Sequence, residues 1–156
     1  MTLLTLMSPN PFDFRTVLLA KHAQHVVLIH FPIALFVTAV GFDLIAYWTK
    51  HRTFADVAYY NLLVAVLATI PVIATGIIAW QLQLEGQRLK GTLLLHLVLG
   101  SASGALICLV WWLHFRPRKR HDELPAYRFA IEALALLVVM ATAHLGGFLS
   151  GVNVPS

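Results

Sequence analysis

Charged residues are scarce in this chain of 156 residues. Asp, Glu, Lys and Arg make up 12% of the sequence, whereas hydrophobic residues make up 59% and the mean hydropathy is +0.78. Soluble domains have about 25% charged residues, so this chain lacks the side chains to cover a water-facing surface. The composition also excludes disorder, because disordered segments are poor in apolar residues. The sequence therefore predicts a membrane protein.

Cysteine is almost absent as well. The single Cys108 excludes an intrachain disulfide and a four-thiolate metal site, and no Cys-x-x-Cys-His motif for covalent haem attachment is present. The sequence contains no phosphate-binding loop, paired-carboxylate motif or nucleophile–base pair, so nothing favours a hydrolase or an ATPase. The net charge of +4 comes from short clusters between apolar runs. Nucleic acid is not an expected partner, because no basic stripe interleaved with aromatic residues is present.

Four long apolar runs dominate the sequence. Each run has about the 20 residues that a helix needs to cross a hydrocarbon core of about 30 Å. The runs do not alternate as the strands of a membrane barrel would, and a lipid-embedded backbone must satisfy its own hydrogen bonds. We therefore predict an all-α integral membrane protein, an antiparallel four-helix transmembrane bundle with connections of about ten residues. The predicted helices span residues 26–48, 59–82, 91–115 and 126–149.

Smaller features refine this organisation. Residues 1–22 are expected to form a short amphipathic segment at the membrane interface, and residues 23–156 the four-helix domain. Pro32 and Pro71 lie within apolar runs and are expected to kink their helices or remove a backbone hydrogen bond. Cys108 is interpreted as a small apolar packing residue.

The distribution of Lys and Arg predicts the orientation in the membrane. Seven of these residues lie on the side that holds the first and third predicted connections, and four lie on the other side. Cytoplasmic segments carry the excess of positive charge, so both termini are expected to be extracytoplasmic, in the inner membrane of the cell. The first side holds Lys50, Arg52, Arg116, Arg118, Lys119, Arg120 and Arg128, and the second Arg15, Lys21, Arg88 and Lys90.

Eight histidines are many for a membrane chain, in which ionisable residues at depth are costly and usually functional. Three of them are interpreted as interfacial, namely His51, His114 and His121, and His22 lies in the N-terminal segment. The other four lie near the extracytoplasmic ends of three predicted helices. At 1.5 Å per residue, His30, His96 and His144 lie about 6–9 Å inside that face, in one layer. His25 precedes His30 and is expected to face elsewhere or to lie at the rim.

Such a layer of imidazoles predicts a cofactor site. Histidine binds iron, copper and zinc, and paired axial histidines hold b-type haem in helical bundles. Gly100 and Gly104 follow His96 on the same helix face and would make room for a flat macrocycle, although the same spacing is common where membrane helices pack closely. The candidate cofactor-binding residues are His25, His30, His96, His144, Gly100 and Gly104, and the candidate metal ligands are His30, His96 and His144.

Two carboxylates also lie within predicted helices, near the cytoplasmic side. Glu132 is expected to pair with Arg128, four residues earlier, and Asp43 with the connection that holds Lys50 and Arg52. A role in proton or quinone binding stays open for both carboxylates.

The sequence also resembles a known family. Residues 25–35 (HVVLIHFPIAL) are similar to the opening helix of a bacterial membrane family catalogued as domain of unknown function 2231. The similarity extends to Ala74-Thr75-Gly76, to His96 and to an ending from His144 to Gly151, and it covers about residues 22–154. Val26 replaces the usual proline, and the glycine spacing at the end is shorter than usual. The resemblance implies four helices, and the fusion of some members to Rieske iron–sulfur domains implies a redox setting.

Together these observations predict a membrane electron-transfer subunit that binds haem b near its extracytoplasmic face. One haem is expected, and four histidines would allow two. The protein would exchange electrons with a quinol or another membrane redox subunit and with an extracytoplasmic electron carrier, as part of a larger complex and not as a stand-alone enzyme. Two alternatives stay open: a cofactor-free structural or assembly subunit, and a copper or zinc site made by three imidazoles.

Overall fold

The computed structural model describes residues 23–83, 86, 88–120 and 124–150, and every regular element in these ranges is a helix. Four helical spans are long and apolar enough to cross a membrane, which confirms the predicted four-helix membrane fold. The amphipathic segment predicted for residues 1–22 lies outside the described residues, as does His121. The helices are α2 (Ala23–Leu28), α3 (His30–Thr49), α4 (Arg52–Gln83), α5 (Gly91–Arg120) and α6 (Arg128–Leu149).

Helices α2 and α3 form one span, Gln24–Thr49, that is interrupted at Ile29. Pro32 causes the interruption, because it has no backbone N–H to donate to the carbonyl of Leu28. The N–H of Ile29 still donates to the carbonyl of His25 at 3.0 Å, and that of Ile33 reaches the carbonyl of Ile29 only at 3.5 Å. The expected loss of regularity at this proline is therefore present. Helix α4, in contrast, continues through Pro71 without interruption.

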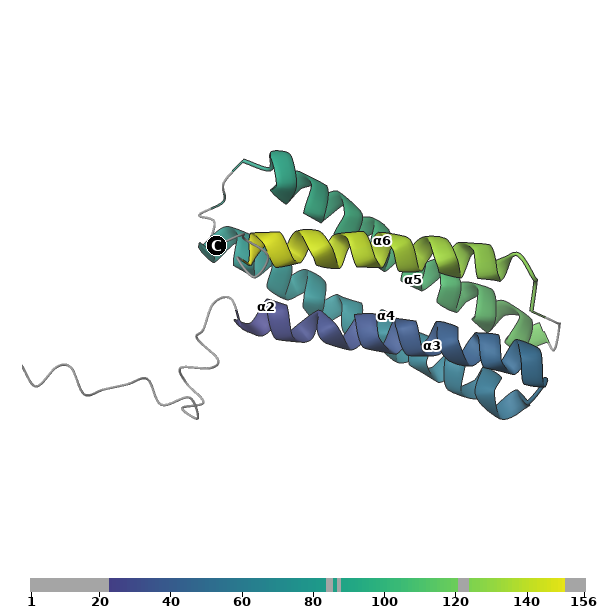
Figure 1. The fold of residues 1–156 in the computed structure, drawn as a ribbon. Coiled ribbons are helices and arrows are strands. Elements are labelled where there is room, and N and C mark those ends of the chain that lie inside the picture. Colours follow the sequence, from purple (N-terminus) through teal and green to yellow (C-terminus); the bar gives the residue numbers. More distant parts are fainter. Residues whose placement is uncertain (1–22, 84–85, 87, 121–123, 151–156) are drawn as a thin grey trace, which may run out of the picture.

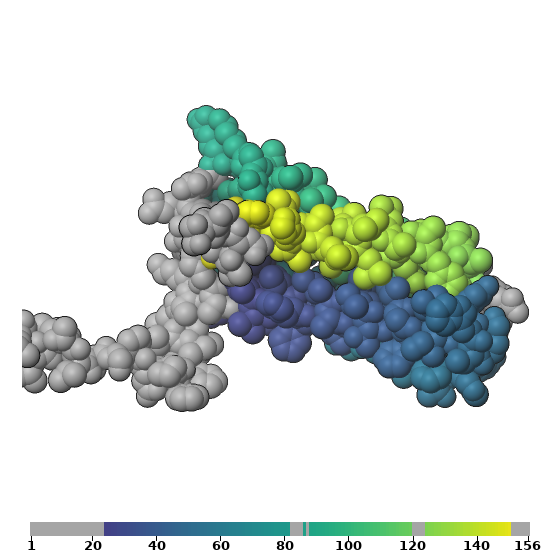
Figure 2. Space-filling view, viewed as in Figure 1, coloured from purple at the N-terminus to yellow at the C-terminus, as the bar shows by residue number. Residues whose placement is uncertain are grey.

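The spans are arranged as two antiparallel hairpins, α3 with α4 and α5 with α6, which lie side by side (Figures 1 and 2). Only residues 50–51 connect α3 to α4, because Lys50 takes up a left-handed conformation with φ of 58° and its N–H donates to the carbonyl of Ala46. The sequence predicted a connection of about ten residues and a second helix that begins at residue 59. Both predictions are therefore wrong. Helix α5 likewise continues to Arg120 instead of ending at residue 115, so that the basic residues after residue 115 belong to the helix.

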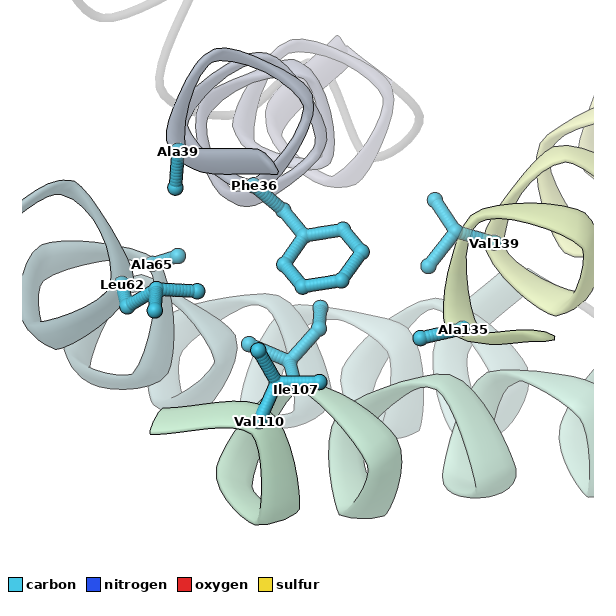
Figure 3. Close-up of a cluster of buried hydrophobic side chains, with 8 residues drawn as sticks. All are labelled: Phe36, Ala39, Leu62, Ala65, Ile107, Val110, Ala135 and Val139. Carbon is cyan, nitrogen blue, oxygen red and sulfur yellow. The ribbon is translucent and has the colours of Figure 1, made fainter. Parts of the chain in front are cut away.

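Side chains from all four spans form the core. The ring of Phe36 lies at its centre, with the other members around it (Figure 3). Many of these residues are small, which lets the helices approach closely, as membrane helices do. The cluster consists of Phe36 and Ala39 from α3, Leu62 and Ala65 from α4, Ile107 and Val110 from α5, and Ala135 and Val139 from α6.

The outer surface is as apolar as the core. Large hydrophobic side chains such as Ile70, Leu137 and Met140 are more than 60% exposed, whereas Asp43 and Glu132 are only 1% exposed. A soluble protein has the opposite arrangement, and an apolar surface of this extent indicates contact with another apolar phase. The described bundle therefore contacts lipid with its hydrophobic exterior. Cys108, which was interpreted as a small apolar packing residue, is exposed and belongs to this exterior.

Candidate functional site

Polar side chains gather at the two opposite ends of the bundle. The first group consists of His25, His30, His96 and His144, and it lies where α2 and α5 begin and where α4 and α6 end (Figure 1). We call this end the histidine end. The second group, which we call the buried polar cluster, consists of Asp43, His114, Arg128 and Glu132, and it lies towards the α3–α4 and α5–α6 connections.

His25 faces helix α4 and is not directed away from the bundle. Its Nδ1 lies 3.2 Å from Oγ1 of Thr75, and that hydroxyl donates its own proton to the carbonyl of Pro71 at 2.8 Å. Because that hydroxyl is already used as a donor, its oxygen is placed to accept from Nδ1–H of His25, and the ring also has the backbone of Val72 as a hydrogen-bond partner. The ring packs on Gly76, where an added Cβ would lie 3.1 Å from Cε1 of His25. The absence of a side chain at Gly76 therefore allows the close approach of the imidazole.

His96 has the same arrangement on the other hairpin. Its Nδ1 lies 3.2 Å from the backbone carbonyl of Thr142, which can only accept, so Nδ1 carries the proton and Nε2 does not. Its ring packs on Gly146 of α6, where a Cβ would lie 3.2 Å from Cε1 of His96. The imidazoles of His25 and His96 are also close enough to interact electrostatically. The structure thus holds His25 against α4 and His96 against α6 in matching geometry.

The other two predicted histidines lie on the surface of the described chain. Nδ1–H of His30 donates to the carbonyl of Val26 at 2.6 Å, within the same span, and the exposed ring of His144 packs edge-on against Phe148. His30, His96 and His144 therefore do not converge as three ligands of one ion. Among the described residues, the only three metal-binding side chains with ligand atoms within 4.8 Å of one another belong to the buried polar cluster.

The two candidate glycines of α5 differ in their surroundings. A Cβ on Gly100 would lie 3.7 Å from Cγ2 of Thr142, and the neighbouring Ser103 shares a 2.9 Å hydrogen bond with the hydroxyl of Thr142. Gly100 therefore belongs to the contact between α5 and α6. Gly104 has no atom within 4 Å of the position of a Cβ. Both glycines were expected to make room for close helix packing or for a cofactor. Close packing is present only at Gly100.

The buried polar cluster differs from the pairs that the sequence predicted. Arg128 donates from Nε to Oδ2 of Asp43 at 2.7 Å and from a terminal nitrogen to Oδ1 at 3.5 Å. Glu132 pairs with His114 instead, with 3.0 Å between Oε1 and Nε2. The predicted pairs of Glu132 with Arg128 and of Asp43 with the α3–α4 connection are therefore wrong. His114 is 3% exposed and lies in the core, so its interpretation as an interfacial residue is also wrong.

A signal for this cluster was present in the sequence. His114 continues the buried stripe of Ile107 and Val110 at helical spacing, and Asp43 does the same after Phe36 and Ala39. Side chains three, four or seven positions apart share a helix face. The positions of Asp43 and His114 relative to their apolar neighbours thus indicated the core, whereas distance along the chain to the nearest opposite charge did not.

A comparison with known families covers almost the whole bundle. The model of a family described as predicted membrane protein (DUF2231) matches residues 21–153. The chain belongs to this family. The match includes all four spans of this DUF2231 protein and every residue of both polar groups. No match was found among curated proteins or among solved structures.

Proposed function

We propose that this DUF2231 protein is a membrane electron-transfer protein that binds b-type haem at the histidine end, where His25 and His96 would hold the iron. The matched arrangement of these two residues carries the proposal. In each ring Nδ1 lies 3.2 Å from an oxygen of a neighbouring helix, a geometry that favours the tautomer with the proton on Nδ1 and with Nε2 as the ligand atom. Metal-ligating histidines in proteins typically have their second ring nitrogen hydrogen-bonded in this way, which fixes the tautomer and the ring plane.

The donor set fits haem better than it fits a bare copper or zinc ion. Two imidazoles suffice for the axial positions of haem iron, since the macrocycle supplies the other four donors. A bare ion needs three or four protein ligands, and His30 and His144 are exposed on the described surface. When bound, haem supplies one-electron transfer. His25 and His96 would bind and orient it, and the apolar bundle would exclude water and set its potential.

The expected partners follow from the membrane setting. The excess of Lys and Arg at the opposite end favours an extracytoplasmic histidine end, in the inner membrane of the cell. Electrons would then pass between a quinol or a neighbouring membrane redox subunit and an extracytoplasmic carrier. His30 and His144, which are exposed at the same end, would be directed at lipid or at such a partner subunit.

The absorption spectrum of the purified protein tests this proposal. The protein should be expressed with haem supplementation, extracted in mild detergent and reduced, and we expect the sharp bands of haem b at about one haem per chain. A colourless, folded protein would contradict the proposal. His25 and His96 would then act as clamps between helices, through their bonds to Thr75 and Thr142, in a cofactor-free subunit.

A further inference from the structure

The buried polar cluster contains an uneven number of charges. Two carboxylates, Asp43 and Glu132, lie 1% exposed beside a single guanidinium, that of Arg128, which is 4% exposed. If both carboxylates were ionised and His114 were neutral, the cluster would hold one uncompensated negative charge buried between the helices. An isolated charge in such surroundings costs several kcal/mol even after relaxation. Charge neutrality therefore requires one additional proton.

The hydrogen bonds show which residues can hold this proton. Arg128 donates to both oxygens of Asp43, so this pair is complete and neutral in itself. Glu132 and His114 are left with one another, 3.0 Å apart. The second oxygen of Glu132, Oε2, is buried and has no hydrogen-bond partner.

We propose that Glu132 and His114 form a proton-binding site within the membrane, which takes up one proton from water and holds it at neutral pH. In the bound state Glu132 is a neutral carboxylic acid whose O–H donates to Nε2 of His114. The partnerless Oε2 favours this state over an ion pair, because an unpaired oxygen costs less on a neutral acid than on a carboxylate. Release of the proton leaves Glu132 as an anion, with the total charge of the cluster at −1.

The same residues are poorly suited to a divalent metal ion. Asp43, His114 and Glu132 could each present one atom within 4.8 Å of the others. However, Arg128 already occupies both oxygens of Asp43 and would repel a cation at that position. A metal ion would have to displace this guanidinium, whereas a proton needs no rearrangement. Metal binding is therefore an outcome that would contradict the proposal.

The charged neighbours of the site come from three of the four spans. Asp43 approaches from α3, His114 belongs to α5, and Arg128 lies one helical turn before Glu132 on α6. Within the described residues, α4 adds no charged group to the cluster, since its Arg52 is exposed and its Asp56 pairs with Arg118 at the surface. The proton affinity of Glu132 is thus expected to depend on Asp43 and Arg128 and to be insensitive to the Asp56–Arg118 pair.

Infrared difference spectroscopy of the purified protein tests the proposal without reference to haem. At pH 7 we expect the C=O stretching band of a protonated carboxylic acid, which shifts in D₂O and which is lost in Glu132→Gln. Asp56→Asn is the matched control, because it removes an exposed carboxylate, and it should keep the band unchanged. In wild-type protein, glutamate labelled with ¹³C at the carboxyl group should shift the band, which tests the assignment even if Glu132→Gln fails to fold.

Three results would overturn the proposal. The first is the absence of an acid band at pH 7 in the wild-type protein, since Glu132 would then be ionised. The second is a band that the ¹³C-glutamate label does not shift. The third is a stoichiometric divalent metal in the purified protein that is lost in Glu132→Gln. A colourless protein that keeps the band would contradict the haem proposal alone, so the two proposals fail separately.

Discussion

The guanidinium of Arg128 lies 2.7 Å from the carboxylate of Asp43, and both side chains are at least 95% buried. The two residues are 85 positions apart and belong to different hairpins, Asp43 to α3 and Arg128 to α6. Helices α3 and α6 otherwise touch in few places, since each packs mainly against its own hairpin partner. The ion pair is therefore a specific polar link between α3 and α6, whereas α4 and α5 make most of the contact between the two hairpins.

Replacement of Arg128 by alanine should destabilise the protein strongly. The substitution leaves the carboxylate of Asp43 buried without a counter-charge, which typically costs about 3–5 kcal/mol. Unfolding by denaturant in detergent micelles measures the effect. The double variant Asp43→Asn/Arg128→Met, which removes both charges, should recover most of the loss, and a double variant as unstable as Arg128→Ala would contradict this explanation.

The pair of Arg118 and Asp56 provides the matched comparison. These side chains are 41% and 48% exposed, and exposed ion pairs contribute about 0–1 kcal/mol. Arg118→Ala should therefore change the free energy of unfolding by no more than this amount. A loss as large as that of Arg128→Ala would mean that burial does not determine the difference between the two pairs.

Gly146→Leu should disturb the histidine end, whereas Gly104→Leu should be tolerated. A side chain at residue 146 would collide with the ring of His96, whose Cε1 lies 3.2 Å from the position of its first atom, but residue 104 has no neighbour within 4 Å. Overpacking of this kind costs about 1–3 kcal/mol. Thermal unfolding and haem content of both variants measure it, and equal behaviour of the two would show that His96 does not depend on Gly146.

The orientation in the membrane can be tested with single cysteines in a Cys108→Ala background. Ser150 and His51 are exposed at opposite ends of the bundle. The asymmetry of Lys and Arg predicts that a membrane-impermeant maleimide labels Ser150→Cys in intact cells and does not label His51→Cys. The reverse pattern would place the histidine end in the cytoplasm.

The sequence was sufficient to predict the four spans, because the length and polarity of a membrane helix are set by the bilayer itself. It was less informative about connections. The two-residue connection depends on the left-handed conformation of Lys50. This conformation is usual for glycine and could not be predicted from the local sequence for a lysine.

The candidate site was predictable in part for a similar reason. The positions of His25, His30, His96 and His144 along their helices predicted that all four lie at one end of the bundle. The side of the helix on which each histidine lies depends on how the helices pack, which the sequence alone did not give. The break at Ile29 and the packing of α2 on α4 bring His25 against Gly76, whereas His30, beyond the break, is exposed. The partners of Asp43 and Glu132 likewise depend on contacts between hairpins, which distance along the chain cannot give.

The central claim is that His25 and His96 together hold a haem, and electron paramagnetic resonance of the oxidised protein tests it most directly. We expect the low-spin signal of iron with two imidazole ligands in the wild type, in His30→Ala, in His144→Ala and in the control His51→Ala. The signal should be lost or converted to high-spin in both His25→Ala and His96→Ala. A low-spin signal that survives either of these two substitutions, or a wild-type protein without iron, would contradict the account.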